Sequence, residues 1–197
     1  MAKLYFKYGA MGSSKSAQAL ITQFNYEELG MTVWLIKPSV DDRDGANIVK
    51  SRVGLSREAE VITPEDSIRA RYAATGGRDV IIADEAQFFM PGQIDELRDI
   101  VDELDVPVLC FGLRTDFLTH MFPGSMRLME LADSITEIKT VCACGSKATV
   151  NARVTPDGRI VTEGEQVFLG GNDAYVAMCH RCWKKKISGQ GTARMKK

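Results

Sequence analysis

The sequence predicts an α/β fold, in which helices cover both faces of a parallel sheet, followed by a small β-rich unit built around cysteines. Apolar strand-like runs alternate with helical periodicity over the first ~140 residues, which is the pattern of parallel strands joined by helical crossovers. From Val141 onward turn residues become frequent, and four of the five cysteines occur there. We expect a main domain at residues 1–140, a metal-binding unit at 141–190 and a disordered basic tail at 191–197.

Short apolar runs predict the strands of the main domain. They are Leu4–Tyr8, Thr32–Ile36, Val80–Ala83 and Val106–Gly112. The polar span from Ser39 to Glu58 has neither helical nor strand periodicity, so we expect a loop there. The basic end of the chain, from Lys184 to Lys197, is expected to be a solvated tail.

Helices are predicted between these strands from apolar spacing and from capping residues. The first ends at Gly30, because a left-handed residue suits a helix end. The second begins at Thr63, a capping hydroxyl before Pro64 at the first helical position, and ends near Gly76 and Gly77. Apolar residues at helical spacing are Ala17, Leu20, Ile21 and Phe24 in the first helix and Ile94, Leu97, Ile100, Val101 and Leu104 in the third.

The 25 basic and 26 acidic side chains nearly cancel, which leaves a formal net charge of −1. This balance provides no overall field for a nucleic acid or a membrane surface, so neither is an expected partner. No segment reaches the ~20 consecutive apolar residues that span a bilayer, and Lys7 and Gly9 interrupt the apolar stretch of a secretory signal. We expect a cytoplasmic protein whose cysteines are thiols or metal ligands.

A phosphate-binding pattern follows the first predicted strand. Residues 9–16 read GAMGSSKS, which is the P-loop pattern with Ser14 in place of its second glycine. Between a strand and a helix, such a loop directs its N–H groups and the positive helix end toward phosphates. Lys15 would contact the β and γ phosphates, and Ser16 would ligate Mg²⁺. The alternative is an ordinary turn, with Ser14 as an N-cap and Lys15 solvated. The predicted nucleotide contacts are Gly9, Ala10, Met11, Gly12, Ser13, Ser14, Lys15 and Ser16.

An acidic pair, Asp84 and Glu85, follows the third predicted strand. Adjacent side chains point apart, so the two carboxylates can hold different roles. Asp84 would support the Mg²⁺ ion of a P-loop NTPase, and Glu85 would take a proton from the group that attacks the γ phosphate. An attacking alcohol would make the protein a kinase, and an attacking water would make it an ATPase. A plain helix-start pair is the alternative.

The cysteines predict a structural zinc site. Cys142 and Cys144 form a tight first knuckle, and Cys179 and Cys182 form a common C-x-x-C knuckle. Four clustered thiolates in a reducing compartment favour tetrahedral zinc over disulfides, and four protein ligands leave no open position for catalysis. His180 is expected to be solvated. Cys110 lies in an apolar run and is expected to belong to the core.

Together these motifs resemble those of a known family. The segments that show the resemblance are GAMGSSKS at 9–16, DDR at 41–43, DEAQFF at 84–89, GLRTDF at 112–117 and EGEQVFLGGNDAY at 163–175. The sequence resembles the type II thymidine kinases over nearly its whole length. The resemblance implies a P-loop NTPase core with a zinc-binding lasso domain, ATP with Mg²⁺ as phosphate donor, and thymidine as acceptor, with deoxyuridine as a further acceptor to test. It also implies a homotetramer, dTTP as a candidate feedback inhibitor, and a nucleotide-side role for Gln87.

Thymine is planar and carries a methyl group, so its site calls for aromatic and aliphatic walls. The resemblance assigns the nucleoside contacts to Met11, Asp41, Arg43, Phe88, Phe117, Phe122, Gln166, Val167, Phe168, Leu169, Gly170 and Tyr175. Asp41 and Arg43 would lie near the sugar and its 5′ end, and residues 166–170 would contact the base through their backbone. The alternative for a single phenylalanine is plain core, which we favour for Phe89. For the charged pair it is a solvated ion pair.

Two other classes of protein fit parts of the sequence. A nucleic-acid-dependent ATPase would combine the P-loop, the acidic pair, a zinc ribbon and a basic tail, but helicase-type engines usually pair two core domains. The basic residues of the tail also lack the interleaved aromatic residues typical of single-strand binding. A noncatalytic zinc-ribbon module would leave Lys15 and Glu85 without a role.

Overall fold

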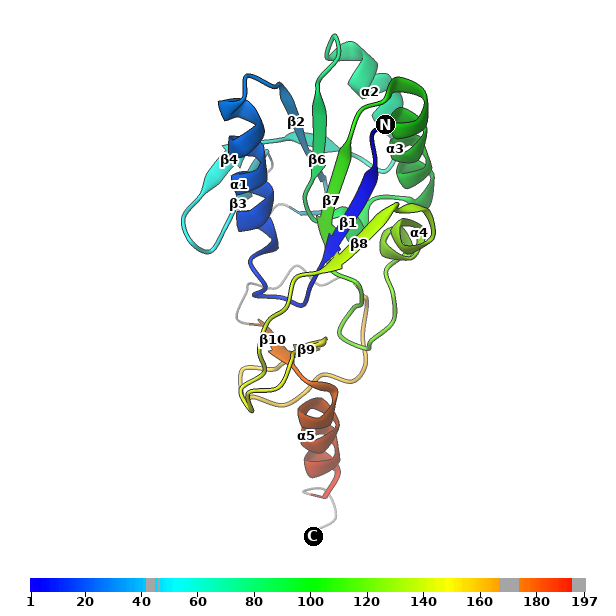
Figure 1. The fold of residues 1–197 in the computed structure, drawn as a ribbon. Coiled ribbons are helices and arrows are strands. Elements are labelled where there is room, and N and C mark those ends of the chain that lie inside the picture. The colour runs from blue at the N-terminus through cyan, green and yellow to red at the C-terminus, as the bar shows by residue number, and fades with distance from the viewer. Residues whose placement is uncertain (42–44, 46, 167–173, 193–197) are drawn as a thin grey trace.

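The computed structural model describes residues 1–41, 45, 47–166 and 174–192. Figure 1 shows a larger part, built on one sheet, with a smaller part that holds β9, β10 and α5 at one end. The elements in chain order are β1 (Leu4–Tyr8), α1 (Lys15–Glu28), β2 (Val33–Pro38), β3 (Ile48–Lys50), β4 (Ser56–Glu58), β5 (Glu60–Ile62), α2 (Ile68–Ala74), β6 (Val80–Ala83), the 3-10 helix η1 (Ala86–Phe88), α3 (Pro91–Leu104), β7 (Val108–Gly112), α4 (Pro123–Leu131), β8 (Ser134–Glu137), β9 (Val150–Arg153), β10 (Tyr175–Met178) and α5 (His180–Thr192).

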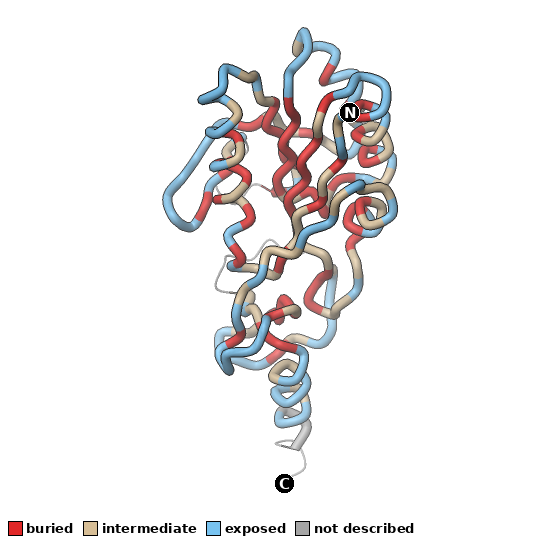
Figure 2. Tube along the Cα trace, in the orientation of Figure 1, coloured by how far each residue is buried: buried red, intermediate tan, exposed pale blue. Residues whose placement is uncertain are grey.

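The large sheet has six parallel strands in the order β5-β2-β6-β7-β1-β8. Strands β6 and β7 are buried on both faces and β2 nearly so, as their apolar runs predict, and they lie in the red centre of Figure 2. Helix α1 packs on one face against Leu35, Ile82 and Phe111, while α3 packs on the other against residues such as Phe6 and Ile81. The α/β prediction is therefore confirmed.

The order of the strands brings three loops to one edge of the sheet. The carboxyl ends of β6, β7 and β1 are neighbours, so the chain leaves the sheet side by side after Ala83, Gly112 and Tyr8. A hydrogen bond from Gly9 N to Gly112 O, 3.2 Å long, joins two of these exits. Open parallel sheets bind ligands at this edge, which is where the predicted P-loop and acidic pair meet.

Several elements differ from the sequence prediction. The polar span expected to be a loop contains a hairpin, because β3 and β4 pair antiparallel. These strands have three residues each and β4 is wholly exposed, so they carry no apolar alternation to detect. Elements β5, α4 and β8 were also not predicted. Strand β7 begins at Val108 and not at Val106, and β2 extends to Pro38.

Two helices differ in detail from the predictions. In α1, Ile21 and Phe24 are each 49% exposed, while Ala19 is buried, so the predicted apolar stripe is only partly right. Helix α2 begins after Ser67, whose hydroxyl accepts a 3.1 Å hydrogen bond from Ala70 N, and not at Thr63. Ser67, four residues after the predicted cap Thr63, is therefore the residue that caps this helix.

The smaller part contains the antiparallel pair β9 and β10 and helix α5. Basic residues expected in a solvated tail, Lys184 to Lys186, lie in helix α5, although all three are exposed as expected. The domain boundary near Thr140 stays a prediction.

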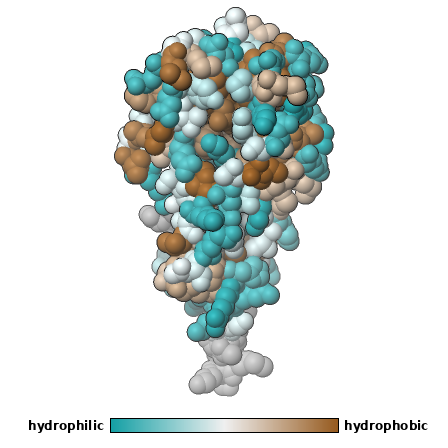
Figure 3. All heavy atoms as spheres, in the orientation of Figure 1, coloured by the Kyte–Doolittle hydropathy of each residue, from teal (hydrophilic) through white to brown (hydrophobic). Residues whose placement is uncertain are grey.

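Apolar side chains on the face seen in Figure 3 form separate patches and not one continuous surface. In the part of the chain that the structure describes, no helix combines the length and apolar character needed to cross a membrane.

Candidate active site

The loop of residues 9–16 connects β1 to α1 and has a compact form. Gly12 has φ +75°, a left-handed conformation that glycine adopts without steric cost. At Gly9 a Cβ atom would lie 2.4 Å from both Ile138 O and Ser13 Oγ, so only glycine fits there. These glycines let the backbone curl at the head of α1, as the P-loop interpretation requires.

Ser14 occupies the position of the missing glycine in a left-handed conformation, with φ 64° and ψ 28°. Its side chain makes no capping hydrogen bond to α1, which contradicts the alternative of a simple N-cap. Its carbonyl oxygen accepts the hydrogen bond from Gln18 N at 3.0 Å. The loop therefore keeps a glycine-type backbone although the residue is serine.

A Ser14→Gly variant should be more stable than the wild type by about 1 kcal/mol, because an L-residue in this conformation is strained by that amount. We expect ATP affinity to change only slightly. Thermal unfolding and calorimetric titration with ATP measure both effects. Ser14→Ala is the matched control and should not be stabilised, since it keeps the strain. Equal stabilisation by alanine, or an ATP effect of several kcal/mol, would contradict this account of the loop.

Polar groups converge inside the loop. Lys15 is 8% exposed, and its ammonium donates to Gly9 O at 3.2 Å and to Ala10 O at 3.1 Å. The Ser13 hydroxyl is buried and has no hydrogen-bond partner among the described atoms. A buried cation and an unsatisfied hydroxyl in the same loop suit an incoming phosphate, which accepts hydrogen bonds from both.

Asp84 is buried at the carboxyl end of β6. Burial and then the charge of Glu85 raise the pKa of Asp84 to about 7, while a hydrogen bond from Ser16 and the charge of Lys15 oppose this rise. The Asp84 Oδ1 atom has no hydrogen-bond partner within the described residues. An orphaned buried carboxylate oxygen next to the Ser16 hydroxyl fits a hard cation such as Mg²⁺, which prefers oxygen ligands.

Glu85 is held by its neighbours. Its backbone is left-handed, with φ 49°, and its half-buried carboxylate accepts a 2.5 Å hydrogen bond from Gln87 Nε2. The Gln87 Oε1 atom accepts from Leu113 N at 2.9 Å, which fixes the orientation of the amide. A Cβ atom at Gly112 would lie 2.6 Å from that oxygen, so a glycine makes room for it. Glu85 precedes η1, but its side chain makes no capping hydrogen bond to it, which argues against a plain helix-start role.

The predicted aromatic walls lie beyond this acidic pair. Phe88 and Phe122 meet edge to face with ring centroids 5.4 Å apart. Phe117 and Phe122 are buried, and Phe88 is half-buried. Phe89 belongs to the main core, as predicted.

Asp41 is almost buried and pairs with Lys37, with 3.2 Å between Nζ and Oδ2. Lys37 is fully buried and also donates to Ile48 O at 2.9 Å. The solvated-pair alternative is therefore wrong for Asp41. Arg43 and Val167, Phe168, Leu169 and Gly170, also predicted to contact the nucleoside, lie outside the described residues.

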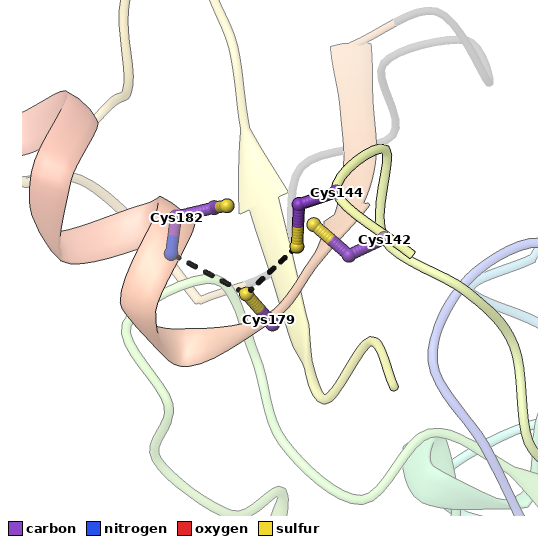
Figure 4. Close-up of side chains that lie close together, drawn as sticks. All are labelled: Cys142, Cys144, Cys179 and Cys182. Atoms are coloured by element: carbon purple, nitrogen blue, oxygen red, sulfur yellow. Dashed lines mark hydrogen bonds between the residues drawn. The ribbon is translucent and has the colours of Figure 1, made fainter. Parts of the chain in front are cut away.

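The four predicted cysteine ligands meet in one cluster (Figure 4). Their Sγ atoms all lie within 4.8 Å of one another, and those of Cys144 and Cys179 are 3.7 Å apart. A tetrahedral Zn²⁺ with Zn–S bonds of ~2.3 Å separates its sulfurs by about 3.8 Å. Cys182 N donates to Cys179 Sγ at 3.4 Å. The donor set and spacing therefore fit zinc.

Hydrogen bonds within the cluster also perturb the thiols. Those from Ser146 lower the pKa of Cys144, and hydrogen bonding to Cys144 raises the pKa of Cys182. A bound metal ion would replace these shared protons. Cys110 is fully buried in β7, and burial raises the pKa of its thiol, as expected for an inert core residue.

Comparison with known proteins identifies the family. A family model described as thymidine kinase matches residues 2–183. The chain belongs to the thymidine kinase family. A thymidine kinase of Ruegeria pomeroyi is 44% identical over 195 residues, which are 97% of this chain and 98% of the relative. Those of Yersinia pseudotuberculosis and Vibrio vulnificus are 44% and 42% identical over 191 and 190 residues, covering 95% of this chain and 97% and 99% of theirs.

In this member of the thymidine kinase family, strand β9 supplies two candidate site residues that were not predicted from the sequence. Asn151 is buried, accepts from Met11 N at 2.8 Å and donates from Nδ2 to Thr115 O at 2.8 Å. It therefore joins the loop of residues 9–16 to the loop after β7. Arg153 contacts the rings of Phe117 and Tyr175. Polar residues two apart on a short strand are the signal that could have found them.

Proposed function

We propose that this protein is a thymidine kinase that transfers the γ-phosphate of ATP to the 5′-hydroxyl of thymidine, giving dTMP and ADP for pyrimidine deoxynucleoside salvage. The observation that carries the proposal is the oriented Glu85 carboxylate. It accepts from Gln87 and follows the buried Asp84, at the sheet edge that also carries Lys15. A fixed carboxylate next to a phosphate-binding loop suits proton removal from an attacking hydroxyl.

The nucleotide would lie on the loop of residues 9–16. Backbone N–H groups and the Lys15 ammonium would hold the phosphates, in place of the carbonyl contacts that Lys15 makes in the structure. Ser16 would ligate Mg²⁺ with support from Asp84, and the metal would neutralise charge that develops on the phosphates. The predicted nucleotide contacts at Gln87 and the rest of the loop belong to this proposal.

In the chemical step, the 5′-oxygen of thymidine attacks the γ-phosphorus and Glu85 takes its proton. The bond between the γ-phosphorus and the β–γ bridging oxygen breaks, and ADP leaves with that electron pair. The nucleoside would lie between Met11, Phe88 and the buried Phe117 and Phe122, with the other predicted contacts at the sugar and base edges. The four cysteines would hold a structural Zn²⁺.

We infer from family membership that the protein is a homotetramer, with dTTP as a candidate feedback inhibitor to test. The main domain at residues 1–140, the lasso domain at 141–190, the terminal tail and the cytoplasmic location, all predicted from the sequence, also belong to the proposal. Size-exclusion chromatography with light scattering, and inhibition by added dTTP, test two of these statements directly.

If the protein is a thymidine kinase, its release of ADP from ATP should depend on added nucleoside and not on added nucleic acid. With Mg²⁺ and ATP, thymidine should increase ADP release strongly, deoxyuridine to a lesser degree, and DNA or RNA not at all. A coupled assay for ADP with each addition measures this. Stimulation by DNA or RNA without any by thymidine would contradict the proposal and favour a nucleic-acid-dependent ATPase.

A further inference from the structure

Arg153, the last residue of β9, is the meeting point of three chain segments. It is 7% exposed, and its guanidinium carbon lies 3.8 Å from the centre of the Phe117 ring. Its Nη2 atom donates to Glu165 O at 3.1 Å and lies 3.5 Å from Gln166 O. The Tyr175 hydroxyl accepts from Nε at 3.1 Å and from Nη2 at 3.0 Å. These contacts join the loop after β7 to residues on two sides of the segment 167–173.

The chemistry of these contacts requires arginine. A guanidinium is planar, so its face can stack on Phe117 while N–H groups at its edge donate to oxygens in its plane. Lysine has a single ammonium on a flexible stem and cannot stack on a ring and direct a fork of donors at the same time. The site thus uses both the face and the edge of one side chain.

We propose that Arg153 is a positioning residue for the nucleoside, which orients Phe117, Gln166 and Tyr175 as one wall of the thymidine site. This inference rests on the proposed function. Each of these three residues is an expected nucleoside contact, and each touches Arg153: Phe117 and Tyr175 through their side chains, and Gln166 through its backbone oxygen. A second link strengthens the arrangement, because Gln166 Nε2 donates to Asp116 Oδ2 at 3.0 Å.

The fold of the smaller part depends on other groups. Strands β9 and β10 pair through their backbones in the register Tyr175↔Arg153 to Met178↔Val150. The cysteine cluster lies at the other end of β10, where Met178 precedes Cys179. Removing the guanidinium should therefore leave strand pairing and metal binding in place, while it frees Phe117 and Tyr175 to move.

The test compares Arg153→Lys and Arg153→Met with the wild type in steady-state kinetics for both substrates. We expect KM for thymidine to rise roughly 10-fold or more in both variants, while KM for ATP stays within about two-fold, because only the nucleoside wall loses its support. Zinc content should match the wild type, and both variants should remain folded, with a somewhat lower melting temperature because buried acceptors lose their donor. Arg159→Lys and Arg159→Met are the matched controls, since Arg159 is exposed and pairs with the nearby Asp157, and they should leave both KM values unchanged.

A wild-type KM for thymidine in folded Arg153→Met protein would overturn the inference. So would an equal rise of both KM values with loss of zinc in the milder Arg153→Lys variant, because that result indicates a purely structural role. If the wild type itself does not phosphorylate thymidine, the proposed function fails first. That outcome is distinct, because it appears without any substitution.

Discussion

A Glu85→Gln variant should lose roughly 100-fold or more of its turnover with thymidine, the usual contribution of a general base. Glutamine has nearly the same shape but cannot accept the proton of the 5′-hydroxyl. Its amide oxygen can still accept from Gln87 Nε2, so the side chain should keep its orientation while it loses the ability to act as a base. ATP affinity should stay within about two-fold, because the loop of residues 9–16 carries the phosphate contacts.

Turnover measured at saturating substrates and ATP binding measured by calorimetry check this expectation. Glu130→Gln is the matched control, since Glu130 is an exposed carboxylate that pairs with Arg127 on α4. The control should keep full turnover. Unchanged turnover in Glu85→Gln would show that this carboxylate is not the general base. A large loss of ATP binding would show that Glu85 instead helps to bind the nucleotide.

Loss of the metal from the cysteine cluster should have the second large effect. A structural zinc stabilises its site by on the order of 10 kcal/mol. The apolar cluster of this unit is small and includes the ligands Cys142 and Cys179 themselves, so little else holds it together. A Cys179→Ser variant, or a chelator, should raise KM for thymidine at least about 100-fold, because Arg153 and Tyr175 lose their framework.

ATP binding should weaken less, through the hydrogen bond that Asn151 Oδ1 accepts from Met11 N. Metal content, KM for each substrate, and recovery after Zn²⁺ is added back to the chelated wild type measure these effects. Cys110→Ala is the control cysteine change, since Cys110 lies in β7 away from the cluster. Full thymidine kinase activity in metal-free protein would contradict the anchoring role.

The four inner strands of the central sheet could be predicted from the sequence because they are largely apolar runs, as burial in a parallel sheet requires, whereas its edge strands β5 and β8 could not. Strand β4 could not, since all its residues are exposed and only pairing with β3 makes it a strand. The start of α2 was misplaced because Thr63 and Ser67 both fit a capping position. Competing local signals of this kind are decided by tertiary packing.

The candidate site shows the same division. The P-loop pattern, the acidic pair and the cysteine knuckles are local motifs, so the sequence predicted their positions. The roles of Asn151 and Arg153 depend on contacts with Met11, Phe117 and Tyr175, which are distant in the chain. Polar residues two apart on one strand indicate a site there but do not identify these partners. The left-handed backbone of Ser14 was hidden for another reason, since serine rarely adopts it and the surrounding loop imposes it.

Transfer of labelled γ-phosphate from ATP to a panel of nucleosides tests the central claim most directly. The claim is that Lys15 and the loop hold the triphosphate while Glu85 deprotonates the 5′-hydroxyl of thymidine. The account predicts that the label appears in thymidine 5′-monophosphate, and that Glu85→Gln nearly abolishes this product. Label found only in inorganic phosphate, whichever nucleoside is present, would contradict it.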